Sequence, residues 1–172
     1  RLSLVGSEMC IRDRVNKDTS GLWFFNSGPL AGASQPHRHI QLLRRDPSEL
    51  SCPREKWILA LNKLNNKNEK FSKNIILKKF SKSLNEENIH EIYKDLSYNL
   101  GLGDPRNDKK PKYPYNLIFT DRWMIIIKRK TDNLFGISIN ALGFAGYILV
   151  TENSDIKYLR ELGPEKLLED FL

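Results

Sequence analysis

The stretch Gly32-Ala-Ser-Gln-Pro-His-Arg-His-Ile-Gln41 holds the most informative pattern in the chain, a small-residue loop that leads into alternating polar and apolar residues. Alternation with a period of two predicts a β-strand over 37–43, because successive side chains of a strand point to opposite faces. The side chains of His37, His39 and Gln41 then share one face, while the apolar residues between them bury on the other. The strand presents two imidazoles and a carboxamide beside a loop whose backbone N–H groups can meet phosphate.

This cluster supports nucleophilic attack on phosphorus. An imidazole with an ordinary pKa of about 6.5 is neutral near pH 7, so it needs no separate base to act as a nucleophile. Its attack gives a phosphoramidate and divides one difficult displacement into two easier steps. In this interpretation His39 attacks, and His37 beside it either orients the ring or contacts the phosphate. Gln41 holds the intermediate because a carboxamide is not a proton source. Ser34, Gln35 and the loop amides stabilise charge on the phosphate oxygens.

The histidine pair is also compatible with a metal site or with a chance arrangement on the surface. Histidines at i and i+2 form half of a metal site, but a zinc site takes three or four ligands. No Cys-x-x-Cys and no nearby acidic pair completes the set, so the sequence predicts no metal site. Two surface histidines can also fall on one strand by chance. The third histidine, His90, falls early in a predicted helix, and we interpret it as a surface residue.

The remaining sequence predicts a mixed α+β fold. Residues 22–25 form a bulky apolar run that stops at turn residues, which predicts a buried strand beside the histidine strand. Apolar spacing and turn signals place the other elements. These are helices over 53–65, 85–96 and from 164 onward, a loop over 67–73, a short strand at 75–77, and a hairpin of 115–120 with 123–128.

Two segments bear on domain organisation. The charged, proline-flanked stretch 104–112 predicts a linker between one domain over 15–103 and a second over 113–172. Residues 1–14 show neither a helical nor a strand period, and they lack the features of a signal peptide. This segment resembles translated sequencing-adapter read-through, so we predict that it is non-native.

Composition limits the classes of function. The 172 residues are 40% hydrophobic with a net charge of +7, which fits a globular protein with anionic partners. Arg38, Arg44 and Arg45 beside the motif are the best candidates for a local positive field. No apolar run approaches the roughly 20 residues of a membrane span. Because Cys10 and Cys52 are the only cysteines, we expect no disulfide framework and a cytoplasmic location.

Two motifs carry a resemblance to a known family. Asn26-Ser-Gly followed by 32–41, with glutamine in place of a third histidine, is similar to the signature of diadenosine tetraphosphate phosphorylase, also called ATP adenylyltransferase. The segments 113–117, 123–124 and 138–146 resemble that family's C-terminal domain. The resemblance implies a histidine-triad-like fold, with a mainly antiparallel sheet and flanking helices. Family members carry further residues before the Asn26 segment, so it also implies a fold that is incomplete at the N-terminus.

The resemblance implies that diadenosine tetraphosphate and phosphate give ATP and ADP through an adenylyl intermediate on His39. It also implies a set of nucleotide- or phosphate-binding residues: Asn26, Gly32, Ala33, Ser34, Gln35, Gln41, Asn140 and Gly143. In this expectation the partners are a small-molecule dinucleoside polyphosphate and inorganic phosphate, with no membrane and no nucleic acid. No cofactor is required, although a divalent metal such as Mg²⁺ can assist.

Two alternatives accompany this expectation. The first is another histidine-triad transferase, with a galactose-1-phosphate uridylyltransferase-like or ADP-sulfurylase-like activity. The second is a non-catalytic nucleotide- or nucleic-acid-binding module that uses the positive charge. An RNA-binding surface interleaves exposed aromatics with basic residues, whereas most aromatics of this chain fall in apolar runs. The sequence therefore favours the enzyme.

Overall fold

A five-stranded antiparallel sheet forms the centre of the computed structural model, which describes residues 21–35, 37–46, 48–64, 69–81 and 86–172. The predicted segment 1–14 lies outside this range. The strand order is β2-β1-β4-β5-β3, with every neighbouring pair antiparallel. In that order the strands are Gln41–Arg44, Gly21–Asn26, Tyr115–Phe119, Trp123–Lys128 and Ile75–Lys79. The α+β, mainly antiparallel fold expected from the sequence is confirmed.

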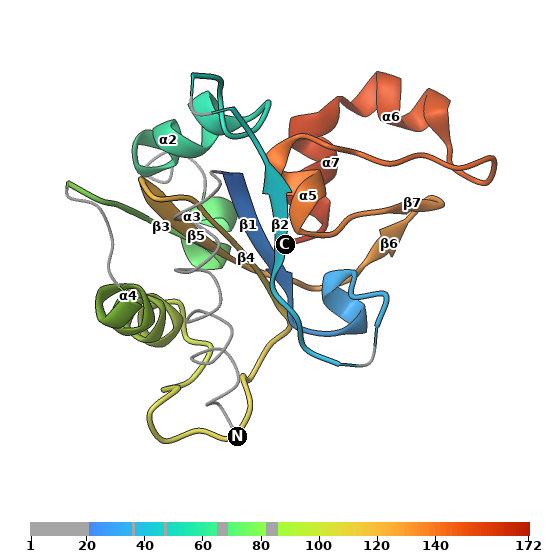
Figure 1. Cartoon of the computed structure of the whole chain (residues 1–172). Coiled ribbons are helices and arrows are strands. Elements are labelled where there is room, and N and C mark those ends of the chain that lie inside the picture. Colours follow the sequence, from blue (N-terminus) through green and yellow to red (C-terminus); the bar gives the residue numbers. More distant parts are fainter. Residues whose placement is uncertain (1–20, 36, 47, 65–68, 82–85) are drawn as a thin grey trace.

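Both faces of the sheet are covered, because its strands are apolar on both sides. On one face, helix α4 (Glu86–Asn99) packs over the sheet, and we call this the α4-side core (Figure 1). Its buried members are Trp23, Phe25, Ile89, Tyr93, Leu96, Leu100, Leu102, Tyr115, Leu117, Phe119, Met124 and Ile126. On the other face lies a larger core, to which α2, α3, α5 and α7 contribute.

The helices on the larger core are short. They are α2 (Glu55–Leu64), α3 (Glu69–Asn74), α5 (Ala141–Ala145) and α7 (Pro164–Asp170). Helix α6 (Ile156–Leu162) precedes α7, and a two-stranded hairpin of β6 (Asn133–Leu134) and β7 (Ile137–Ser138) extends from the same side (Figure 1). No helix in the described part of the chain has the length and apolar character needed to cross a membrane.

Most predicted elements are present, and two local predictions were wrong. The segment 67–73 was expected to be a loop, but residues 69–74 form α3, because Phe71 is buried and its ring packs edge-on against Trp57 at 5.6 Å. The histidine strand was expected over 37–43, but β2 begins only at Gln41. Its pairing with β1 starts at the partners Gln41 and Phe24, and residues 37–40 precede that ladder.

The segment 104–112, predicted to separate two domains, is a loop within one fold. Strand β1 before it pairs with β4 after it over four residue pairs, Trp23 to Phe119 through Asn26 to Asn116. The larger core also combines residues from both sides, such as Ile58 and Phe144. The loop therefore does not divide the sheet or the core into separate units.

Cys52 provides a test of this packing. Its side chain is 1% exposed in the larger core, and burial raises the pKa of its thiol to about 11. In a Cys10→Ser variant at pH 8, we expect Cys52 to react with a thiol reagent about a hundredfold more slowly in the folded chain than in urea, because thiolate is the reactive form. Equal rates in both conditions would contradict the buried position.

Candidate active site

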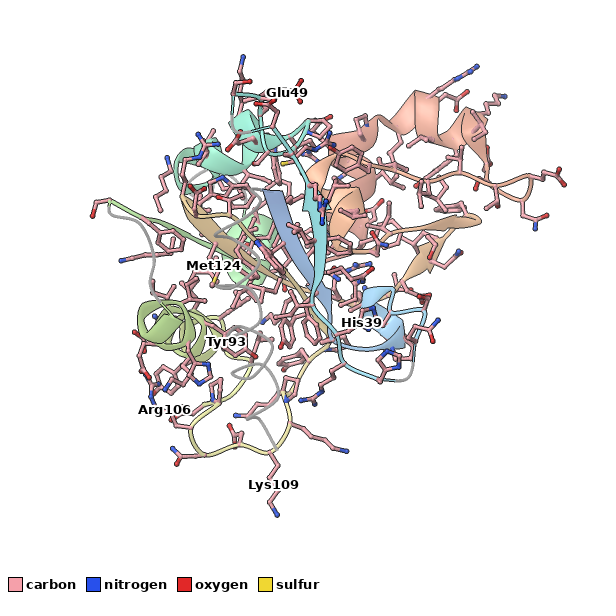
Figure 2. All side chains as sticks on the ribbon, in the orientation of Figure 1. His39, Glu49, Tyr93, Arg106, Lys109 and Met124 are labelled. Carbon is pink, nitrogen blue, oxygen red and sulfur yellow. The ribbon has the colours of Figure 1, made fainter. Side chains whose placement is uncertain are left out.

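The two imidazoles of the motif lie together immediately before β2. The ring centroids of His37 and His39 are 5.0 Å apart, and the rings are tilted by 44° to each other. His37 is exposed, whereas His39 is half-buried on the connection between the short 3-10 helix η1 (Pro29–Ala31) and β2 (Figure 2). The two side chains meet as the alternating pattern predicted, although residues 37–40 lie outside the strand.

A hydrogen bond to the backbone favours one tautomer of His39. Its Nδ1 lies 3.2 Å from the carbonyl oxygen of His37. Because a carbonyl oxygen can only accept, Nδ1 carries the proton in this contact. In the neutral ring the lone pair then resides on Nε2. That nitrogen is the one available for attack on an electrophile.

Gln41 is the first residue of β2, opposite Phe24 of β1. Ile40 and Leu42 pack against the α4-side core, while Leu43 packs against the larger core. Since alternate residues of a strand share a face, the Gln41 side chain lies on the same face as Leu43. The sheet therefore directs this carboxamide away from α4.

Gly32, in the loop before the histidines, contacts the C-terminal motif directly. Its backbone has φ of 77°, in the left-handed region, and a Cβ added there would lie 2.7 Å from Cβ of Asn140. The same Cβ would lie 3.0 Å from the carbonyl oxygen of Ile139. The two motifs that are more than a hundred residues apart in the sequence are thus packed against each other, and only glycine fits between them.

Replacing Gly32 by alanine should lower the free energy of unfolding by about 1–3 kcal/mol, because the new Cβ meets backbone and the positive φ is strained. Chemical denaturation measures the change. Gly28→Ala is the matched control, since Gly28 is extended and an added Cβ there would have no neighbour within 4 Å. A loss no larger than that of the control would show that the close approach to Asn140 is absent.

Asn140 and Gly143 hold helix α5 in place. The side-chain Oδ1 of Asn140 accepts hydrogen bonds from the backbone N–H groups of Leu142 at 2.9 Å and Gly143 at 3.3 Å, which makes it the N-cap of α5. Gly143 is buried, and an added Cβ would lie 2.8 Å from Cγ2 of Ile139. Both residues therefore have structural roles that account for their identity without a ligand.

The loop amides are partly engaged within the loop. Gly32 donates its N–H to the carbonyl oxygen of Pro29 at 2.7 Å, and Ala33 donates to Gly28 at 3.1 Å. Ser34 and Gln35 follow with exposed side chains. Of the loop residues expected to contact phosphate, Ser34 and Gln35 are thus the more accessible.

Asn26 is tied into a buried polar network at the end of β1. Its Oδ1 accepts hydrogen bonds from Nδ2 of Asn116 at 2.7 Å and from the backbone N–H of Ala141 at 2.9 Å. Asn116 is fully buried, and its Nδ2 also donates to the carbonyl oxygen of Ala31 at 2.8 Å. Asn26 and Asn116 together therefore join β1, β4, η1 and α5. Among the described residues no partner is seen for Nδ2 of Asn26, which is the part of the side chain that can meet a ligand.

Arg129 completes this network from the end of β5. The residue is 3% exposed, and its guanidinium donates to Oδ1 of Asn116 and to the carbonyl oxygens of Thr131 at 2.7 Å and Ile139 at 2.8 Å. Burial lowers the pKa of Arg129 to about 10, so it remains charged at neutral pH. Sequence reasoning missed this role, although Asn116 stands out as a polar residue inside an apolar strand run and Arg129 lies two residues after another such run.

A family model described as the ATP adenylyltransferase C-terminal domain matches residues 52–171. The chain belongs to this family. A second model, the Ap4A phosphorylase N-terminal domain, matches residues 8–59, which include the histidine motif. Residues 8–14 of the segment predicted to be non-native fall inside that second match.

Two yeast proteins are similar to this family member in sequence. Protein APA1 of Saccharomyces cerevisiae is 25% identical over 170 residues, covering 86% of this chain and 50% of the yeast protein. The yeast diadenosine 5',5'''-P1,P4-tetraphosphate phosphorylase 2 is 24% identical and covers 81% and 48%. The chain thus spans about half the length of the curated relatives it matches.

Solved structures agree on the fold. The crystal structure of yeast Ap4A phosphorylase Apa2 superposes with a TM-score of 0.62 at 18% identity, covering 97% of this family member and 60% of Apa2. The structure of Apa2 in complex with AMP gives a TM-score of 0.61, and that in complex with Ap4A gives 0.57. At these identities the likeness concerns the arrangement of the chain.

Proposed function

We propose that this chain carries the nucleotidyl-transfer centre of an Ap4A phosphorylase, which converts diadenosine tetraphosphate and phosphate into ATP and ADP. The observation that supports the proposal most is the geometry of His39, whose Nδ1 is held by the carbonyl of His37 so that Nε2 bears the lone pair. Membership of the ATP adenylyltransferase family and the names of the yeast relatives support the choice of substrate.

In the first step the Nε2 lone pair of His39 attacks the phosphorus of one adenylyl group. A P–N bond forms while the P–O bond to the rest of the molecule breaks, and ATP leaves with that electron pair. AMP then remains attached to His39. In the second step an oxygen of inorganic phosphate attacks the same phosphorus, the P–N electrons return to Nε2, and ADP is released.

The neighbouring residues support charge and orientation in this proposal. His37 holds the ring of His39 through its carbonyl and lies beside it with its own imidazole. Ser34 and Gln35 are exposed on the preceding loop, where they can donate to the phosphate oxygens. Gln41 can hydrogen-bond the intermediate without donating a proton. The two steps use no resident cofactor, and a Mg²⁺ ion carried by the polyphosphate is compatible with them.

The reaction is tested with the 172-residue chain, diadenosine tetraphosphate and ³²P-labelled inorganic phosphate. We expect ATP and ADP in equal amounts, with the label in the β-position of ADP, and no net turnover when phosphate is omitted. Release of AMP at the same rate without phosphate would indicate a hydrolase instead. Nucleotide binding with neither turnover nor a covalent adduct would favour a binding module and overturn the proposal.

A further inference from the structure

A cleft of about 370 Å³ lies where the loop after β1 faces the segment leading into β4. The cleft is lined by Ser27, Gly28, Pro29 and Leu30, by residues 110–114, and by Arg38. Of the described residues, neither His37 nor His39 lines this cleft. It is therefore a separate space beside the candidate active site.

The cleft is strongly basic. Arg38, Lys110 and Lys112 line it, and no aspartate or glutamate does so among the described residues. Within that part of the chain, none of the three cations forms an ion pair with a carboxylate. Cations that converge on one cleft without counter-ions of the protein create a local field that attracts an anion.

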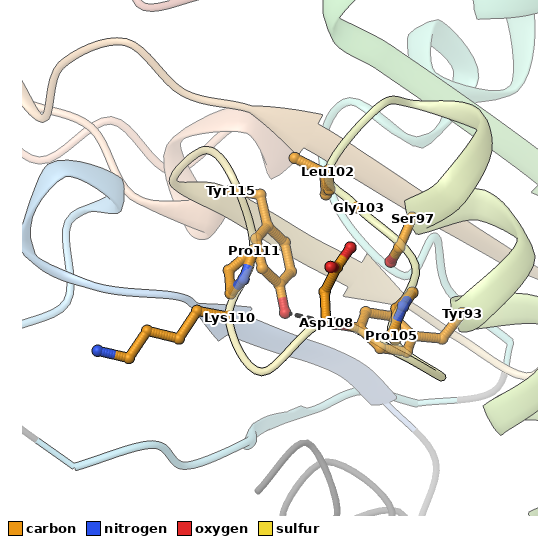
Figure 3. A pocket seen from close by; sticks show the side chains of 9 residues that line it. All are labelled: Tyr93, Ser97, Leu102, Gly103, Pro105, Asp108, Lys110, Pro111 and Tyr115. Carbon is orange, nitrogen blue, oxygen red and sulfur yellow. Dashed lines mark hydrogen bonds between the residues drawn. The ribbon is translucent and has the colours of Figure 1, made fainter.

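The lysines of the cleft stand on a loop that is fixed at several points. The backbone N–H of Lys112 donates to the carbonyl oxygen of Leu102 at 2.9 Å, and Oδ2 of Asp108 accepts from the N–H of Asp104 at 2.7 Å. Arg106 pairs with carboxylates of α4. Lys110 also borders the space between this loop and α4, and Figure 3 shows the end of its side chain pointing away from Tyr93 and Asp108. The backbone that carries these cations is thus positioned before a ligand binds.

Exposed apolar surface borders the cations. The side chains of Tyr113 and Leu30 are 50% and 51% exposed at the cleft. Lys128 Nζ lies 4.9 Å from the centroid of the Tyr113 ring. A half-exposed aromatic ring next to several cations matches a ligand that has both a flat base and phosphate groups, because bases stack on aromatic side chains and phosphates pair with lysine and arginine.

Arg38 connects the cleft to the histidines. It stands between His37 and His39 in the chain, and Ile40, two residues further on, packs against the α4-side core. Burial raises the pKa of Tyr93 and Tyr115 on that side, and the charge of Arg38 acts on both hydroxyls in the opposite direction. A ligand held by Arg38 in the cleft therefore lies next to the chain segment that carries the imidazoles.

We propose that this cleft binds a nucleoside polyphosphate, with Arg38, Lys110 and Lys112 on the phosphates and Tyr113 against the base. The inference rests on the proposed function for its substrate class. The ligand has two sources, the remote half of the dinucleotide that is being cleaved or a second nucleotide molecule. Both place the same chemistry in the cleft, and kinetic experiments separate them.

Titration calorimetry of the chain with ATP and with inorganic tripolyphosphate tests the cleft itself. We expect Lys110→Ala/Lys112→Ala to weaken binding of both probes at least tenfold. Lys109→Ala/Lys130→Ala removes the same charge from exposed positions outside the cleft lining and should change binding less than twofold; Lys109 lies at the outer end of the loop (Figure 2). Equal effects of the two double variants would overturn the proposal.

The contribution of the Tyr113 ring to ATP binding is tested separately. Tyr113→Ala should weaken ATP binding but leave tripolyphosphate binding unchanged, whereas Tyr98→Ala, at a comparably exposed tyrosine of α4, should affect neither. His39→Ala should retain the lysine-dependent binding of ATP, because the imidazoles lie outside the cleft. Loss of ATP binding in His39→Ala, with no effect of the cleft lysines, would place the nucleotide at the histidines and overturn the proposal.

Cleavage of diadenosine tetraphosphate identifies the source of the ligand. If the remote half of the substrate occupies the cleft, Lys110→Ala/Lys112→Ala should raise KM at least tenfold with kcat within about twofold. If a second nucleotide occupies it, KM should stay constant, and added ATP should change the rate of the parent chain but not that of the double variant. Lysine-dependent ATP binding in a chain that forms no adenylyl adduct would support the cleft and contradict the proposed function. Adduct formation in a chain whose ATP binding does not depend on these lysines would support the proposed function and contradict the cleft.

Discussion

His39→Ala should lower the rate of adenylyl transfer by at least about a thousandfold, because the variant lacks the atom that forms the covalent intermediate. The direct measurement is incubation with adenylyl-labelled diadenosine tetraphosphate in the absence of phosphate. The parent chain should form a labelled adduct that is labile in acid and stable in alkali, as expected for a P–N bond, and His39→Ala should form none.

The matched control for this substitution is His90→Ala. His90 lies on α4, on the opposite side of the sheet from Gln41 and α5, so its loss should leave the adduct yield within about twofold. His37→Ala separates the role of the His37 carbonyl from that of its imidazole. Because His37 holds His39 through a backbone carbonyl that alanine retains, labelling should persist at a reduced rate. Undiminished labelling of His39→Ala would show that another residue is the nucleophile.

Arg129→Ala should lower the free energy of unfolding by about 3–5 kcal/mol, the range typical for breaking a buried charged network by removing one partner. The variant leaves Oδ1 of Asn116 and the carbonyl oxygens of Thr131 and Ile139 without their donor in a buried environment. It also removes the cation that lies 5.1 Å from the Phe144 ring centroid. Urea denaturation followed by tryptophan fluorescence measures the change.

Lys130→Ala is the control for this prediction, since the neighbouring side chain is exposed and should contribute less than about 0.5 kcal/mol. Arg129→Lys keeps a charge but cannot reproduce the planar set of donors, so we expect an intermediate loss. Because Asn116 also holds Asn26 and Ala31, the folded fraction of Arg129→Lys should show reduced adenylyl transfer. A stability loss in Arg129→Ala no larger than that of Lys130→Ala would contradict the network.

Elements that depend on local patterns were predicted well. Strand β1 was predicted because an uninterrupted apolar run of 22–25 suits a strand that is buried on both faces. The β4–β5 hairpin was recognised from two apolar runs with a short polar turn, and α4 from the spacing of Ile89, Tyr93 and Leu96. In each case the buried residues are close together in the sequence, so periodicity alone carries the information.

Elements that depend on a distant partner were not predicted well. The sequence of α3 is polar apart from Phe71, and its helix is stabilised by packing of that ring against Trp57 of α2. The start of β2 is set by where β1 offers partners, and the role of 104–112 depends on the pairing of β1 with β4. None of these partners can be identified from the local sequence.

By itself the sequence determined that His37 and His39 lie together beside a small-residue loop, and that the chain forms an antiparallel α+β fold. The tertiary structure decided why Gly32 must be glycine, and that Asn26, Asn116 and Arg129 form one buried network. The reason is physical. Alternation of side chains is a local property of the backbone, whereas close approach and burial of polar groups arise only when segments far apart in the chain pack together.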